Sequence, residues 1–456
     1  MKSDNPNNKK KGSKLQWPQF LINNPIINQP FLGNVAVVAL GPIFSQALSA
    51  LLSPVYSRIY SPEEFGAVGV FLSLLAVLVP IANLSLSYAI ILPRRDKDSI
   101  TILNLNLIFS LILSAIILIV ILLFKDPISR ILNFQDYAGF LYFLPLALFF
   151  STASIAYDEW LVRKKKFKNS SIVTICQSGV TNAVQLGMGF LTPAYASLIG
   201  VNIFSRGFHT LLAFLFSKKT IQEAKSIDHS PEQPSQPKAL LKEYKDFPLF
   251  RTPQILLSTL SINLPIILMS GFSGQAVTGL FTFAQRILKL PAIVVADSLG
   301  KVFLQKLSES AQKKQSLQPL ILKATLLLSG IGAIIFSVIA IFGPVLFSFI
   351  FGAEWTEAGV FAQWMSLLVF VSFCSVPVVI AIPILNLQKQ YLIFEFFNLL
   401  ASSIGLIIGF RVLKDNVAAI AISSITSALL TIIWIVLVII QSNNLNRYQA
   451  ASDSPQ

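Results

Sequence analysis

Charged side chains are scarce in this sequence. Asp, Glu, Lys and Arg together make up 12% of its 456 residues, whereas apolar residues make up 54%. A soluble globular protein carries about twice that share of charge. So few charges cannot cover the surface of a soluble protein of this length, and the composition therefore predicts an integral membrane protein.

Cysteine and histidine are almost absent, with two of each in the whole chain. Cys176 and Cys374 both lie in apolar runs, which argues against a disulfide framework. No Cys/His cluster surrounds His209 or His229, so no metal site is expected. No hydrolase triad, phosphate-binding loop or nucleotide-binding fingerprint is recognisable either. The sequence therefore predicts neither a cofactor nor an enzymatic activity.

Long apolar runs dominate the chain instead. A helix needs roughly 20 apolar residues to cross a bilayer, and about twelve runs approach or exceed that length. We therefore expect an all-α membrane protein with about twelve spans. They are expected at 35–59, 65–93, 101–124, 138–162, 170–192, 194–217, 252–272, 276–303, 322–350, 359–386, 389–412 and 416–441.

The basic residues are divided unevenly between the two sides of the predicted membrane. If the N-terminus is cytoplasmic, most of the 35 Lys and Arg residues fall in the N-terminal arm and the even-numbered connections. The other side receives Arg58, Lys125, Arg130, Arg411 and Lys414. This asymmetry follows the positive-inside rule. It predicts that both termini are cytoplasmic, and it accounts for the net charge of +14 without a nucleic-acid partner.

One long connection divides the predicted spans into six and six. We expect a cytoplasmic N-terminal arm over 1–32, a six-helix bundle over 33–217, a cytoplasmic linker over 218–251, a second six-helix bundle over 252–441 and a cytoplasmic tail over 442–456. The centre of the linker is rich in Pro and Ser and is predicted to be disordered. A weak echo relates the halves: SPEEFGAVGVF (Ser61–Phe71) resembles SGQAVTGLFTF (Ser273–Phe283), with Gly66 matching Gly279.

The predicted span 276–303 carries Arg286, Lys289 and Asp297. Arg286 lies about 15 Å along the helix from Ala276, at 1.5 Å per residue, and so near the middle of the bilayer. A charge at that depth costs at least about 2.5–3.5 kcal/mol on insertion scales. At about 100° per residue the three charges fall on one side of the helix. That side should face a water-filled cavity or a partner helix.

Four basic side chains inside spans are candidates for binding a substrate: Arg286, Lys289, Arg206 and His209. Such groups suit an anionic headgroup such as a lipid pyrophosphate, because arginine forms paired hydrogen bonds with phosphate. A structural interpretation competes with this one. Glu395 could neutralise Arg286 or Lys289, Asp297 could neutralise Lys289, and His209 could be a packed polar side chain.

Two acidic residues inside spans, Asp297 and Glu395, are candidates for coupling to an ion gradient. A carboxylate in a poorly solvated site can load and release a proton. The alternative is a charge near the cytoplasmic end of its helix, without a role in coupling.

Four segments carry a resemblance to a known family: DFPLFRTP, GLFTFAQRILKLP, LGKVFLQKLSE and FGAEWTEAGVFAQWM. Over about residues 30–445 the chain resembles the O-antigen and oligosaccharide flippases of the multidrug/oligosaccharidyl-lipid/polysaccharide exporter superfamily. The resemblance implies two six-helix bundles around a central cavity in the bacterial inner membrane. It also implies alternating access that carries an undecaprenyl-pyrophosphate-linked oligosaccharide to the outer leaflet, for O-antigen, lipopolysaccharide or exopolysaccharide. The AQR motif implies that Arg286 is a cavity cation.

The same resemblance implies partners: membrane lipids, protons or sodium ions as coupling ions, and a polysaccharide polymerase. Two other functions compete with it. A multidrug exporter of the same superfamily would favour acidic groups in its cavity, whereas the groups at mid-depth here are mainly basic. A membrane polysaccharide polymerase or ligase would need a large outer loop with catalytic groups, and the outer loops predicted here are short.

Overall fold

The computed structural model describes residues 30–191, 195–227, 236–312, 315–385 and 387–452, although not the side chains of 30–40, 195, 292–302, 305, 308, 312 and 444–452. Within these ranges the chain is all-α, as expected. Its N-terminal part consists of α2 (Pro30–Ile59), α3 (Pro62–Asn83), α4 (Leu86–Ala89), α5 (Asp96–Ile131), η1 (Gln135–Phe143), α6 (Leu144–Arg163), α7 (Phe167–Leu191) and α8 (Tyr195–Ile227).

The C-terminal part begins with a short helix, α9 (Pro237–Glu243), and the π-helical turn η2 (Phe247–Arg251). The remaining elements are α10 (Thr252–Gln312), α11 (Gln318–Phe351), η3 (Ala353–Trp355), α12 (Thr356–Ala381), α13 (Gln388–Ile408), η4 (Gly409–Leu413) and α14 (Asn416–Ser452). α14 continues as a helix to Ser452, beyond the start of the predicted tail over 442–456, and the tail itself stays a prediction. The proline-rich centre of the linker, 228–235, lies outside the described residues.

Nine helical segments of the described chain are long and apolar enough to cross a membrane. The chain is therefore a multi-pass membrane protein, but the expected number of twelve spans is not confirmed. The expected spans 252–272 and 276–303 both lie in α10, which bends where Gly274 adopts a φ of 80° and a ψ of −178°. Glycine takes up this conformation without a steric penalty. The Gly/Ser-rich turn predicted here is the point where the chain folds back.

The expected span 65–93 is shorter than predicted. Its start follows from a capping box: Ser61 caps the backbone of Glu64, and the Glu64 side chain accepts from the Ser61 backbone N–H at 2.8 Å. Its helix, α3, ends at Asn83 because Leu84 and Ser85 both have positive φ values, of 49° and 54°. The run around the break is largely apolar despite Asn83, Ser85 and Ser87, so the sequence predicts one continuous span.

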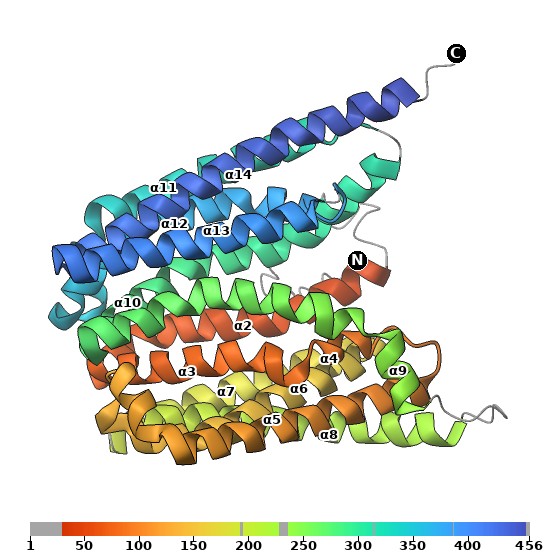
Figure 1. The fold of residues 1–456 in the computed structure, drawn as a ribbon, viewed down its shortest axis with the longest axis horizontal. Helices are drawn as coiled ribbons and strands as arrows, with labels where there is room; N and C mark the ends of the chain where they lie inside the picture. The colour runs from red at the N-terminus through yellow and green to blue at the C-terminus, as the bar shows by residue number, and fades with distance from the viewer. Residues whose placement is uncertain (1–29, 192–194, 228–235, 313–314, 386, 453–456) are drawn as a thin grey trace, which may run out of the picture.

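The helices pack as two groups, which we call the N-terminal half (α2–α8) and the C-terminal half (α11–α14 with the second part of α10). In Figure 1 the two groups converge at the end where α10 folds back and diverge toward the end where α14 finishes. We call these the joined end and the split end. The expected division at residues 218–251 stays a prediction.

The joined end has one core that both halves share. Phe65 of α3 packs edge-on against Phe283 of α10 and Trp355 of η3, each with ring centroids 5.3 Å apart. The indole N–H of Trp355 donates to the carbonyl oxygen of Ser57 at 2.9 Å, and Ser57 Oγ donates to the carbonyl oxygen of Phe351 at 2.9 Å. These bonds close the joined end with both apolar and polar contacts.

The split end has two separate cores instead. Leu86, Ile100 and Trp160 belong to a cluster formed by N-terminal helices together with α9. Leu307 and Trp434 belong to another, formed by C-terminal helices. Neither cluster contains residues from the opposite half among the residues described. The halves are therefore held together mainly at one end.

The tightest approach between the halves is the crossing of α3 and α10 at Gly66 and Gly279. A Cβ atom on Gly66 would overlap the carbonyl oxygen of Gln275, and one on Gly279 would overlap the carbonyl oxygen of Pro62. The two glycines matched by the internal echo thus meet in space. Small residues permit this backbone approach between membrane helices.

We expect Gly66→Ala and Gly279→Ala each to destabilise the protein by about 1–3 kcal/mol, the usual range for overpacking. The added methyl group meets backbone atoms, which cannot move aside as a flexible side chain would. Thermal unfolding of the purified protein measures this effect as a lower Tm.

Gly330→Ala is the matched control, because the added Cβ there meets no atom within 4 Å. Unchanged Tm values for both crossing variants would show that the crossing does not hold the halves together.

Candidate functional site

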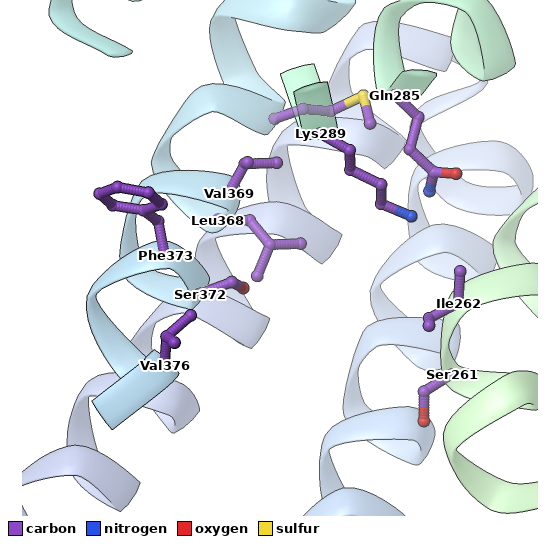
Figure 2. Close-up of a pocket in the computed structure, with 10 residues that line it drawn as sticks. Ser261, Ile262, Gln285, Lys289, Leu368, Val369, Ser372, Phe373 and Val376 are labelled. Atoms are coloured by element: carbon purple, nitrogen blue, oxygen red, sulfur yellow. The ribbon is translucent and has the colours of Figure 1, made fainter. Parts of the chain in front are cut away.

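Lys289 lies in the wall of a pocket of about 360 Å³ between the two parts of α10 and α12. Gln285 lies one turn before it on the same helix, and Ser261 and Ile262 lie on the first part of α10. Figure 2 shows the side chains of Lys289 and Gln285 extending from their helix into the space between α10 and α12. This volume lies within the usual range for sites that bind small molecules or parts of larger ones.

The wall opposite Lys289 is almost entirely apolar. It is formed by one side of α12: Met365, Leu368, Val369, Ser372, Phe373 and Val376. Side chains three and four residues apart share a helix face, so this run lines the pocket over more than two turns. The pocket thus combines one ammonium group with a long hydrocarbon surface.

A second, smaller pocket of about 80 Å³ adjoins the first, and the two share Ser261 and Gln285. It is rich in hydroxyl groups from α13 and α14: Ser402, Ser423, Ser424 and Ser427. The sequence analysis missed these serines, because single hydroxyl groups in a span are common. The detectable signal was the grouping of Ser423, Ser424 and Ser427 within about one turn of one predicted span, 416–441.

Arg286 lies near the first pocket but faces the other half. Its side chain is exposed. It interacts electrostatically with Tyr56 of α2. The Tyr56 hydroxyl donates to Oδ1 of Asn182 in α7 at 2.8 Å. The expectation that Arg286 faces a partner helix or a cavity rather than lipid is consistent with this placement.

Neither Arg286 nor Lys289 has a carboxylate partner among the side chains that the structure describes. Glu395, the sequence candidate for such a partner, instead lies against the hydroxyl group of Tyr391 one turn away. Glu395 lines neither of the two pockets. The side chain of Asp297, the other candidate, lies outside the described part of the structure.

The other two basic candidates lie elsewhere. Arg206 donates to Ser151 Oγ at 2.9 Å, and Nε2 of His209 lies 2.8 Å from Oδ2 of Asp158. Both contacts join α8 to α6 within the N-terminal half. The four sequence candidates are therefore not one cluster. Among the described side chains Lys289, Arg286 and Arg206 all lack a carboxylate partner, and Arg206 differs in bonding a neutral serine of α6.

This arrangement can hold an anion next to a hydrocarbon chain. The ammonium of Lys289 supplies a point charge with three hydrogen-bond donors, and Gln285 with the nearby serines can bond hydroxyl groups. A hydrocarbon chain can contact the α12 side of the pocket. In a medium of low dielectric constant, the attraction between Lys289 and an anion is stronger than in water.

Comparison with known proteins places these features in context. Residues 55–360 match the family described as "Polysaccharide biosynthesis protein". A curated relative, the succinoglycan biosynthesis transport protein ExoT of Rhizobium meliloti (strain 1021), is 22% identical over 335 residues, which cover 71% of this chain. The match spans 63% of the length of ExoT.

Two solved structures share the fold. One is an inward-facing multidrug resistance MATE family transporter of the MOP superfamily, with a TM-score of 0.65, 15% identity and coverage of 90% of this chain and 96% of that one. The other is the lipid II flippase MurJ in an inward closed conformation, also with a TM-score of 0.65 and 15% identity, covering 92% and 94%. At this identity the likeness shows the fold, which is the one implied by the resemblance in sequence.

Replacing Lys289 by methionine should stabilise the protein, by roughly 1–3 kcal/mol, because an unpaired charge inside a span opposes folding. Methionine has a similar length and helix propensity, so the pocket keeps its shape. The measurement is the Tm of the purified variant in one detergent.

Lys323→Met, at an exposed position of α11, is the control and should leave the Tm unchanged. A lower Tm for Lys289→Met would mean that Lys289 has a stabilising structural partner.

Proposed function

The chain belongs to the polysaccharide biosynthesis protein family, and on this premise we propose that it is a flippase for a polyprenyl-pyrophosphate-linked oligosaccharide. Its substrate would cross the cytoplasmic membrane by alternating access during the synthesis of a cell-surface polysaccharide. The observation that carries this proposal is the pocket in which the unpaired Lys289 faces the apolar side of α12. The names of the relatives, a transport protein and a flippase, support transport as the activity.

Each part of such a substrate has a matching part of the site. Lys289 and Arg286 would hold the pyrophosphate, whose negative charge would replace the missing carboxylate partners. The isoprenoid carbons next to the pyrophosphate would lie along Leu368 and Val376 of α12. Gln285 and the serines of the second pocket would bond sugar hydroxyl groups, which bring both donors and acceptors.

The arrangement of the halves supports alternating access. The basic-rich connections lie at the split end, where Arg163 and Lys164 both pair with Asp96, at 2.9 and 2.7 Å. By the positive-inside rule this end would face the cytoplasm. The described conformation would then be closed toward the outside and separated toward the cytoplasm, ready to receive substrate from the inner leaflet.

A multidrug exporter is the competing function within the same fold. An exporter of cationic drugs needs acidic groups in its pocket, whereas the charged side chain that lines the first pocket is a lysine. Repulsion between Lys289 and a cationic drug would oppose binding. Coupling by Glu395 or Asp297, and a polysaccharide polymerase as partner, stay predictions from the sequence.

Deletion of the gene should cause the lipid-linked oligosaccharide to accumulate on the cytoplasmic leaflet, because synthesis continues while export stops. Lipid extraction followed by mass spectrometry, with enzymatic digestion from one side of the membrane, measures this accumulation. A deletion strain with normal lipid-linked intermediates and increased drug sensitivity would instead identify a drug exporter.

Arg286→Ala should abolish restoration of surface polysaccharide in that strain, because the pyrophosphate loses a paired hydrogen-bond donor. Arg286→Lys should restore only part, since an ammonium keeps the charge but not the planar geometry. Surface glycan is measured at equal amounts of protein in the membrane.

Lys323→Ala is the control variant, because it removes a cation that faces neither pocket. Full export by Arg286→Ala would remove Arg286 from the binding site.

A further inference from the structure

A histidine–aspartate pair lies in the interior of the N-terminal half and has no role in the proposed binding pocket. Nε2 of His209 on α8 lies 2.8 Å from Oδ2 of Asp158 on α6, and their side chains are 15% and 32% exposed. The second carboxylate oxygen, Oδ1 of Asp158, is buried without a hydrogen-bond partner. Buried polar atoms are nearly always satisfied, so an exception at an ion pair inside a span requires an explanation.

Few other charges face this pair. Glu159 follows Asp158 and interacts with it electrostatically, and Arg206 lies one turn before His209 and bonds Ser151. The nearest polar groups of α7, Gln177 and Thr181, are uncharged and bond Ser205. The other elements packed against α8 carry their charged residues near their ends: Glu63 and Glu64 on α3; Asp96, Lys97, Asp98, Lys125, Asp126 and Arg130 on α5; and Asp136 on η1.

The position of the pair connects it to the junction between the halves. α6 and α8 pack against each other, and both also pack against α3. α3 is the helix that crosses α10 at Gly66 and Gly279. A change in the attraction between α6 and α8 therefore acts on the helix that holds the two halves together.

We propose that Asp158 and His209 form a proton-binding site that couples transport to the proton gradient across the membrane. The inference rests on the proposed transport function. It assigns coupling to a pair that includes His209, a substrate-binding candidate from the sequence, and not to Asp297 or Glu395. Histidine is the side chain whose charge ordinarily changes between about pH 5 and 8. Its partner is a carboxylate that has a free, buried oxygen atom.

The step itself is a simple proton transfer. In the loaded state the imidazolium of His209 pairs with the carboxylate of Asp158. On unloading, an N–H bond of the ring breaks, its electron pair stays on the nitrogen, and water takes the proton. The remaining contact is a hydrogen bond between a neutral ring and a carboxylate, which attracts α6 to α8 less strongly.

In the described conformation the 32% exposure of Asp158 leaves a route for proton exchange. Asp158 lies five residues before the end of α6 at Arg163, and so about 7–8 Å from the split end. The site is therefore close to the split end, where it can exchange protons with water.

The decisive variant is the neutral pair Asp158→Asn with His209→Gln, which keeps a hydrogen bond between α6 and α8 but cannot carry a proton. The probe is lipid-linked oligosaccharide extracted from the deletion strain and reconstituted with the protein in vesicles. Wild-type transport should change at least about fivefold with an imposed pH gradient, the lower end of typical coupling between sites. The neutral pair should lose this response.

Exchanging the two residues, Asp158→His with His209→Asp, should restore the response, because the pair is present again with its members reversed. A purely structural role predicts instead that the neutral pair keeps the wild-type pH response, and that result would overturn the proposal. Loss of the response in Glu159→Gln or Glu395→Gln, with the neutral pair still responsive, would place the coupling site at that residue.

A second measurement is independent of any substrate. The chain has only two histidines, so His229→Gln leaves His209 as the single signal in a ¹⁵N-histidine NMR spectrum of the protein in lipid. Its ring signals should change with the pH of the sample; signals that stay constant would refute the proposal. If the wild type moves no lipid-linked oligosaccharide, the proposed function fails, and this titration still decides whether the pair binds a proton.

Discussion

The close crossing of α3 and α10 is the contact on which the rest of the structure depends. Gly66 and Gly279 let two backbones approach to a distance that no other residue allows. Around this point the aromatic rings of Phe65, Phe283 and Trp355 pack edge to face or tilted against one another, and a hydrogen bond from Trp355 of η3 to the Ser57 carbonyl links the C-terminal half to α2. The halves share a core at this end and, among the described residues, have separate cores at the other, so they are attached to each other mainly at the joined end.

The same architecture explains how unpaired cations persist within a membrane protein. Lys289 and Arg286 follow the crossing by about two to three turns on α10. Lys289 faces a pocket and Arg286 faces Tyr56 across the junction, so neither needs to meet acyl chains. An anionic substrate would neutralise both charges. Both lie on α10, the helix that also crosses α3 at the joined end.

The basic side chains within the membrane have different surroundings in the two halves. In the C-terminal half the charged groups near the pockets are left without partners, which suits binding and release of a charged substrate. In the N-terminal half Arg206 and His209 already have partners on α6. A cation with a partner is a poor site for a bulky anion, but a pair of titratable groups is suited to a small ligand such as a proton.

Much of the architecture was determined by the sequence alone. Apolar runs of span length predicted the all-α membrane fold, the charge asymmetry predicted an orientation, and the Gly/Ser-rich turn predicted the reversal at Gly274. These features are local or compositional, so each can be recognised without knowing which helices touch. The break after Asn83 escaped because two left-handed residues leave no mark in an apolar run.

Only the tertiary structure decided which polar residues meet. Arg286, Lys289, Arg206 and His209 look equivalent in the sequence, since each is a basic group within a span. Their partners lie on helices far away along the chain: Tyr56, the α12 wall, Ser151 and Asp158. Helical periodicity shows the side of a helix on which a residue lies, but the neighbouring helix on that side is set by packing. The sequence therefore identified the candidate residues, and the tertiary structure showed which groups each of them contacts.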